Sequence, residues 1–197
     1  MAREYCDLLA LPISGRGVDT PARLAMVASR LGYAHLGLYR YQGRISGTPG
    51  LEVLSVMDHG TRDARRADLR IARGRRSRGA VSSDNIDFII PDPRDRVTIR
   101  FAGENDVPLA YAYSDLLMER SIRRSNLLRR WNLVHREATK HGCRELLVSG
   151  TGNSYLLRDP RDLASLLVSA LGLSTEEALD WVSSTPCQVL KRANGRG

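Results

Sequence analysis

Short apolar runs separated by amphipathic segments recur along most of the chain. Six of these runs predict buried strands, because they are apolar, short and bounded by turn-forming residues. They lie at residues 4–11, 35–41, 51–57, 86–90, 109–113 and 145–149. The segment 95–105 alternates like a strand near Ile99, but its spacing to the next predicted strand favours a helix.

Helical spacing and capping residues mark most of the intervening segments. Apolar residues recur every three or four positions, as on one face of a helix, in residues 21–31, 121–141, 160–171 and 175–183. Helix starts are signalled by Thr20-Pro21, by Asp159-Pro160, and by Ser174 with Glu177. Gly32 and Gly172 are suited to ending two of these helices. Residues 41–50 predict a loop, and Pro186 predicts a short terminal turn.

The alternation of strands and helices predicts one α/β domain spanning residues 1–197. Continuous alternation is typical of a parallel sheet with helices outside. Seven or eight strands favour a TIM-barrel-like (βα-repeat) barrel over an open sheet. The first strand is not followed by the Gly-x-Gly-x-x-Gly pattern of dinucleotide-binding folds, which argues against that class.

Positive charge is concentrated in two segments of the chain. Residues 62–78 contain eight arginines and two aspartates, and residues 119–144 contain eight basic residues and two glutamates. Each segment therefore carries +6, and because the whole chain is +8, the remainder is −4. We expect 62–76 to form a polar helix on the outside. In 121–141, basic residues project from the face opposite Leu127 and Trp131.

This distribution is typical of a protein that binds a polyanion. Few aromatic residues lie among the arginines, which favours phosphate contacts and recognition of RNA shape over base stacking. The residues expected to contact RNA are Arg65, Arg66, Arg75, Arg76, Arg78, Arg129, Arg136 and Lys140. Two alternatives stay open: a solvated surface whose arginines reflect an arginine-biased genome, and a scaffold whose basic face meets an acidic protein.

Catalytic groups are sparse at the predicted strand ends. Asp7, Asp58 and His59 could make a metal-dependent phosphoesterase, but they are few for a two-metal hydrolase. A serine nucleophile elbow would need glycine at position 147, where Leu147 stands. The glycines of segment 149–154 could cradle a phosphate, and a tight turn explains them equally well. We therefore expect no catalytic and no metal-binding residues.

The remaining composition favours a cytoplasmic protein without a membrane anchor. No apolar run approaches the ~20 residues of a membrane helix, and we expect no signal peptide. The three cysteines, Cys6, Cys143 and Cys187, are widely scattered, which suits reduced thiols. The chain has no Cys-x-x-Cys motif for zinc.

The order of segments resembles the protein component 3 family of archaeal ribonuclease P, which is related to a eukaryotic ribonuclease P/MRP subunit. The C-terminal third carries most of the likeness, in Leu147-Val148-Ser149-Gly150, Arg158-Asp159-Pro160-Arg161-Asp162-Leu163, Ala170-Leu171-Gly172-Leu173, and the segment from Ala178 to Pro186. Weaker matches are Val107-Pro108 with the following strand, Ser114-Asp115-Leu116-Leu117, and Arg100-Phe101-Ala102. Three features depart from the family: Leu8-Leu9 where members often carry a histidine, residues 43–50, and details of 62–78.

The resemblance implies a barrel akin to metal-dependent phosphoesterases but without their ligands. It implies a non-catalytic subunit of ribonuclease P, in which RNA removes the 5′ leader of precursor tRNA. The partners would be the ribonuclease P RNA, the component-2 protein subunit and, indirectly, precursor tRNA. No cofactor would bind this chain, and magnesium would serve the RNA. By position, Arg100 and Lys140 would contact RNA, and Arg158 and Asp162 would contact RNA or a partner. A local Arg158–Asp162 pair is the alternative.

Overall fold

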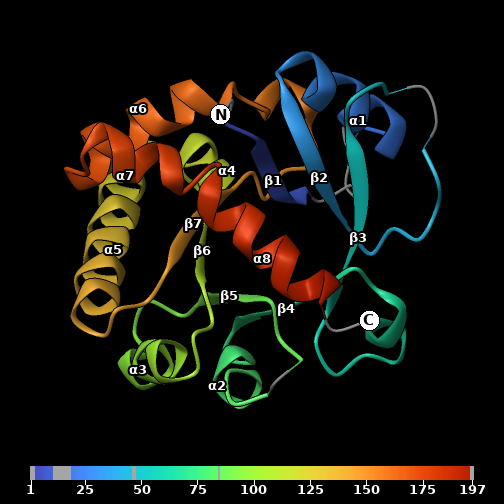
Figure 1. Ribbon diagram of the computed structural model, residues 1–197. Helices are drawn as coiled ribbons and strands as arrows, with labels where there is room; N and C mark the ends of the chain where they lie inside the picture. The colour runs from blue at the N-terminus through green and yellow to red at the C-terminus, as the bar shows by residue number, and fades with distance from the viewer. Residues whose placement is uncertain (1–2, 11–18, 46–47, 84, 196–197) are drawn as a thin grey trace.

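The computed structural model describes residues 3–10, 19–45, 48–83 and 85–195. Seven parallel strands follow one another around a sheet in sequence order. The strands are β1 (Tyr5–Ala10), β2 (Tyr33–Tyr39), β3 (Glu52–Asp58), β4 (Leu69–Gly74), β5 (Phe88–Pro91), β6 (Leu109–Ala112) and β7 (Glu145–Val148). The predicted βα-repeat fold is confirmed (Figure 1).

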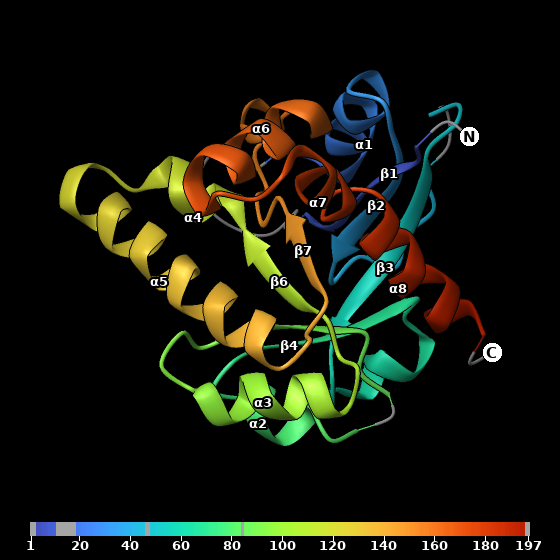
Figure 2. The same ribbon diagram turned by 60° about the vertical axis from the view of Figure 1, so that its left-hand side comes forward.

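The helices lie mostly outside the strands (Figures 1 and 2). They are α1 (Pro21–Arg30), α2 (Ser77–Ala80), α3 (Arg96–Glu104), α4 (Tyr113–Met118), α5 (Ser121–Lys140), α6 (Pro160–Leu171), α7 (Thr175–Asp180) and α8 (Ser184–Asn194), with the 3₁₀ turns η1 (Arg62–Arg66) and η2 (Ser154–Leu156). Helix α3 confirms the choice of helix for 95–105, and the Asp95 carboxylate caps it by accepting from the Thr98 N–H at 3.1 Å. None of the described helices is long and apolar enough to cross a membrane.

Hydrogen bonds close the barrel between its last and first strands. The Gly150 N–H, just after β7, donates to the Leu9 carbonyl of β1 at 2.7 Å. At the other end of the seam, the segment after α7 bridges the two strands, because the Cys6 N–H donates to Val182 and the Leu147 N–H donates to Trp181. The result is a barrel whose seam is part strand and part loop.

The barrel interior is an apolar core with one helix across its floor. Leu8, Val56, Ile71 and Phe88 are buried there, together with Val189 of α8. Helix α8 crosses the amino-terminal ends of the strands, since its Gln188 side chain accepts a hydrogen bond from Arg144, which directly precedes β7. The carboxyl-terminal ends of the strands form the opposite mouth.

Two predicted elements were wrong, each for a reason visible in the sequence. Residues 62–76 are not one polar helix, because only η1 is helical and β4 follows it. The alternation Leu69-Arg70-Ile71 has the period of two that a strand requires, and its apolar members face the core. The terminal turn at Pro186 is the eleven-residue helix α8. Proline is tolerated in a first helical turn, and Val189 and Leu190 beyond it are buried.

Candidate nucleic-acid interface

Three neighbouring outer helices carry most of the predicted RNA-contacting residues. Helix α2 packs against α3, and α3 packs against α5, so the three lie side by side along one side of the barrel (Figures 1 and 2). An ion pair of 3.9 Å joins Arg96 of α3 to Glu137 of α5. The predicted residues on this side are Arg75, Arg76, Arg78, Arg100, Arg129, Arg136 and Lys140. We call this set the outer-helix arginines, including its one lysine.

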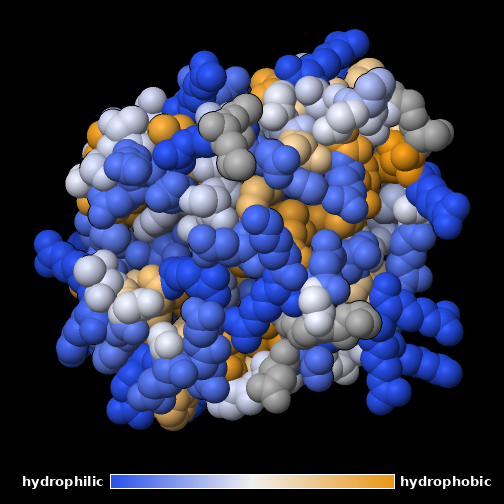
Figure 3. All heavy atoms as spheres, viewed as in Figure 1, coloured by the Kyte–Doolittle hydropathy of each residue, from blue (hydrophilic) through white to orange (hydrophobic). Residues whose placement is uncertain are grey.

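Most of the outer-helix arginines have no internal counter-charge. All seven side chains are exposed, and Figure 3 shows a largely hydrophilic surface over this part of the molecule. Among the described residues, no hydrogen bond or ion pair engages the side chains of Arg75, Arg76, Arg129, Arg136 or Lys140. Two residues of the set are exceptions: Arg100 pairs with Glu104 at 3.4 Å and lies over the Phe101 ring, and Arg78 interacts electrostatically with the Asp95 carboxylate. The exposed positive charge is thus available to an outside partner.

Other arginines in the same two segments hold the fold together. Arg70 donates to the Ala64 carbonyl at 2.9 Å and fixes η1 against β4. Arg124 donates to the carbonyls at the end of α4, including Leu116 at 3.0 Å. Arg144 pairs with Asp106 at 2.8 Å. Charge density alone therefore overstates the binding surface, since these arginines are engaged within the fold.

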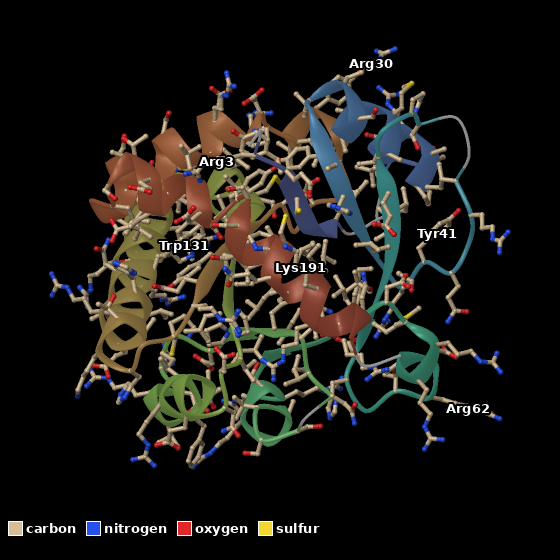
Figure 4. All side chains as sticks on the ribbon, viewed as in Figure 1. Arg3, Arg30, Tyr41, Arg62, Trp131 and Lys191 are labelled. Atoms are coloured by element: carbon tan, nitrogen blue, oxygen red, sulfur yellow. The ribbon has the colours of Figure 1, made fainter. Side chains whose placement is uncertain are left out.

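Arg65 and Arg66 lie apart from the outer-helix arginines. They belong to η1, whose first residue, Arg62, is at the lower right of Figure 4, whereas Trp131 of α5 is at the left. Both side chains are exposed and line a hollow with Ala193 beside the end of α8. The structure therefore divides the predicted RNA-contacting residues between two regions of the surface.

Arg158 has a structural role that the sequence pattern did not indicate. Its Nη1 donates to the carbonyls of Tyr155 at 2.6 Å and Leu157 at 2.9 Å. These bonds shape the loop that leads into α6. Asp162 is exposed in the first turn of α6. None of the ion pairs among the described residues joins it to Arg158, so the alternative of a local Arg158–Asp162 pair was wrong.

A cluster of aromatic and charged side chains occupies the carboxyl-terminal mouth of the barrel. Tyr39 ends β2 and Asp58 ends β3, and the Tyr39 hydroxyl donates to the buried Asp58 carboxylate. Arg40 donates to the same carboxylate at 3.0 Å, and this hydrogen bond raises the pKa of Arg40. Arg73 of β4 donates to the Tyr39 hydroxyl at 2.7 Å. Burial raises the pKa of Tyr39, which keeps the phenol protonated.

A cavity of about 780 Å³ opens beside this cluster. We call it the mouth cavity. Its polar lining is Arg40, Asp58, His59, Arg73, Arg75 and Arg76. The sequence pattern pointed to Asp58 and His59 as possible metal ligands but did not point to Arg40 and Arg73. Their positions at the carboxyl-terminal ends of β2 and β4, the two strands that flank β3, were the available signal, since parallel strand ends meet at one mouth.

The three candidate metal ligands do not form a site. Asp7 is buried, and its Oδ1 accepts from the Ser149 N–H at 2.9 Å. Burial raises the pKa of Asp7. Asp58 instead faces Arg40 and Arg73 at the mouth. No group of three or more potential ligands is placed to hold a metal ion in the described part of the chain. The geometry therefore does not support a phosphoesterase built on these residues.

Several donors of the loop 149–154 are used within the fold. The Ser154 N–H and hydroxyl both donate to Asp19, at 2.7 and 2.5 Å. The Ser149 hydroxyl donates to Leu9. The Asp19 carboxylate thus occupies both Ser154 donors, and the Gly150 N–H donates to the Leu9 carbonyl, which favours the structural interpretation of the glycines over a phosphate cradle.

Comparison with known proteins decides the family. A model of the family described as RNase P subunit p30 matches residues 82–197, more than half of the chain. This chain belongs to the RNase P subunit p30 family. Ribonuclease P protein component 3 of Methanococcoides burtonii is 25% identical over 215 residues, covering 96% of this chain and 88% of that protein.

Solved structures share the fold of this p30-family chain. A chain in the cryo-EM structure of archaeal ribonuclease P with mature tRNA superposes with a TM-score of 0.72 at 15% identity, covering 96% of this chain and 91% of that one. The crystal structure of A. niger ochratoxinase gives a TM-score of 0.60 at 11% identity, with 95% and 71% covered. The TIM-barrel-like class is confirmed by both.

The three features in which the sequence departs from the family all lie outside the residues that the family model matches. Residues 82–197 include Arg100, Lys140 and Arg158. The first strand, the segment 43–50 and the arginine-rich segment 62–78 lie before the match. Membership of the RNase P subunit p30 family therefore rests on the second half of the barrel, where α3 and α5 carry their exposed basic side chains.

Proposed function

We propose that this chain is a protein subunit of ribonuclease P and supports removal of the 5′ leader from precursor tRNA by binding the ribonuclease P RNA. The observation that carries the proposal is the set of outer-helix arginines, exposed and mostly without internal counter-charge on a p30-family barrel. Such residues bind phosphates and release counterions from RNA. The RNA supplies the chemistry and uses the magnesium, and this chain contributes no catalytic group.

The distribution of charge supports recognition of folded RNA over single strands. The outer-helix arginines are spread over three adjacent helices and the turn before α2. Within this set, Arg100 lies over an aromatic ring, that of Phe101. Binding by phosphate contacts across a broad surface suits a structured RNA. Binding of single strands would need several exposed rings for stacking.

We further propose the component-2 subunit of ribonuclease P as the protein neighbour. Two large apolar side chains, Met118 and Ile122, are 71% and 77% exposed where α4 meets α5. A protein covers such side chains more favourably than RNA does. Arg158 and Asp162 are the second candidate contact.

The Ile122→Lys variant is expected to weaken capture of the component-2 subunit, and Met26→Lys, at another exposed apolar residue, is the control. Equal capture by both would place that interface elsewhere.

The RNA-binding claim is tested by salt dependence. The triple variant Arg129→Gln/Arg136→Gln/Lys140→Gln is expected to bind a ribonuclease P RNA more weakly. The slope of log affinity against log salt should fall by about 0.7–0.9 for each phosphate that the variant no longer neutralises. An unchanged slope would remove α5 from the interface. A partner that bulk RNA does not displace in a pull-down would instead favour an acidic protein.

A further inference from the structure

The mouth cavity carries a surplus of positive charge that the fold does not neutralise. Four arginines line it, and Asp58 is the one carboxylate among its lining residues. Arg40 and Arg73 direct part of their hydrogen-bonding capacity at Asp58 and Tyr39. Each guanidinium has five N–H donors, so both retain donors for a ligand. The side chains of Arg75 and Arg76, at the rim, make no hydrogen bond or ion pair to any described residue.

The inner arginines are held in place before any ligand arrives. Their guanidinium carbons lie 5.1 Å (Arg40) and 4.4 Å (Arg73) from the centre of the Tyr39 ring. Arg40 has a φ of 55°, a region that non-glycine residues rarely adopt. Its N–H donates to the Val56 carbonyl at 2.8 Å, which fixes that conformation. Backbone strain of this kind concentrates at functional sites, and fixed side chains lose less entropy on binding.

The place and size of the mouth cavity suit a ligand. Barrels of this class bind their ligands at the carboxyl-terminal mouth, and a volume of about 780 Å³ lies within the range of small-molecule sites. Ile71, Ala72 and Ala80 supply apolar lining. Several guanidinium groups around one space offer more donors than the two oxygens of a carboxylate ligand can accept. They therefore suit a phosphoryl group better than they suit a carboxylate.

We propose that the mouth cavity is a phosphate-binding site, in which Arg40 and Arg73 hold a phosphoryl group and Arg75 and Arg76 guide it in. Tyr39 and Asp58 are positioning residues that orient the inner pair. Arg76 directly precedes α2, so the cavity rim is continuous with the outer-helix arginines. This continuity makes RNA one source of the phosphoryl group, and that part of the proposal rests on the proposed function. A free nucleotide is the other source of the same chemical group.

Nuclear magnetic resonance of the arginine Nε–Hε groups tests the site in the wild-type chain. Titration with inorganic phosphate is expected to shift the signals of Arg40 and Arg73 to saturation, while chloride of equal ionic strength leaves them in place. The Arg73→Gln variant is expected to weaken this phosphate response by about tenfold. Arg30→Gln, an equal loss of charge on exposed α1, is the control and keeps it. No shift with phosphate, or the same shift with chloride, would overturn the proposal.

Two further titrations identify the source of the phosphoryl group. If RNA supplies it, ribonuclease P RNA shifts the same two signals and adenosine monophosphate binds no more tightly than phosphate. If a nucleotide supplies it, adenosine monophosphate saturates the signals at lower concentration than phosphate, and RNA does not shift them. The α5 triple variant separates the two claims, because it should lose RNA affinity and keep the phosphate response. Normal RNA binding without any phosphate response would overturn this inference alone.

Discussion

The carboxylate of Asp7, on the first strand, accepts a 2.9 Å hydrogen bond from the Ser149 N–H at the end of the last strand. This bond helps to close the barrel. The other carboxylate oxygen of Asp7, Oδ2, is buried and has no hydrogen-bond partner among the described residues. A buried carboxylate without an ion pair is costly in its charged form. Asp7 therefore contributes to closure of the barrel.

The Asp7→Asn variant is expected to be at least as stable as the wild type at neutral pH. Burial raises the folded-state pKa of Asp7 above the ordinary 3.8. The folded state then binds the proton more tightly, so Asp7 makes stability fall as the pH rises from about 3.8 through the raised pKa. An amide keeps the acceptor for Ser149 and removes this dependence. Urea unfolding at several pH values measures it. Strong destabilisation with an unchanged pH profile would contradict this account.

A second dependence of folding stability on pH is expected from His135 on α5. Its Nδ1 lies 2.8 Å from the Glu145 Oε2, and this hydrogen bond raises the pKa of His135 above 6.5. A raised histidine pKa gives stability that is full below about pH 6.5 and is lost as the pH rises through the folded value. Burial raises the pKa of Glu145, which also accepts from Tyr111 at 2.5 Å.

The His135→Gln variant should therefore flatten the stability profile between about pH 6 and pH 8. Thermal unfolding across this range is the measurement. His59 at the barrel mouth makes no side-chain hydrogen bond or ion pair within the described segments, so His59→Gln is the matched control. A flattened profile in the control, or an unchanged one in His135→Gln, would refute the assignment.

Helix α8 is expected to stabilise the barrel through its buried apolar face. Leu190 packs into the barrel core and is 7% exposed. Leu190→Ala should lower the free energy of unfolding by about 2–5 kcal/mol, since it removes buried methyl groups and leaves a cavity. Lys191→Ala, at the next and exposed position, should change it by less than about 0.5 kcal/mol. Equal effects of the two changes would mean that α8 is not part of the folded core.

Much of this architecture could be predicted from local patterns. Six strands and the capping box at Ser174 and Glu177 follow from signals within a few residues, the α3 helix follows from the spacing to the next predicted strand, and all are confirmed. Strand β4 was missed because the arginines around Ile71 hid an alternation of period two. Helix α8 was missed because Pro186 favours a turn, although Val189 and Leu190 beyond it are apolar.

The site was less predictable because it depends on contacts between distant segments. Sequence indicated which segments are basic, but not that Arg70 and Arg144 are held internally. Tyr39, Asp58 and Arg73 are far apart along the chain, and the barrel brings them together at one mouth. The RNA contacts of the outer-helix arginines stay a prediction.

The most direct test of the central claim is cleavage of precursor tRNA by a reconstituted ribonuclease P particle. The particle is assembled with and without this chain, and 5′-leader removal is followed over a series of magnesium concentrations. The account predicts that the chain lets the RNA work at lower magnesium, and that the α5 triple variant loses this gain while Arg30→Gln keeps it. Equal cleavage with and without the chain at every magnesium concentration would contradict the account.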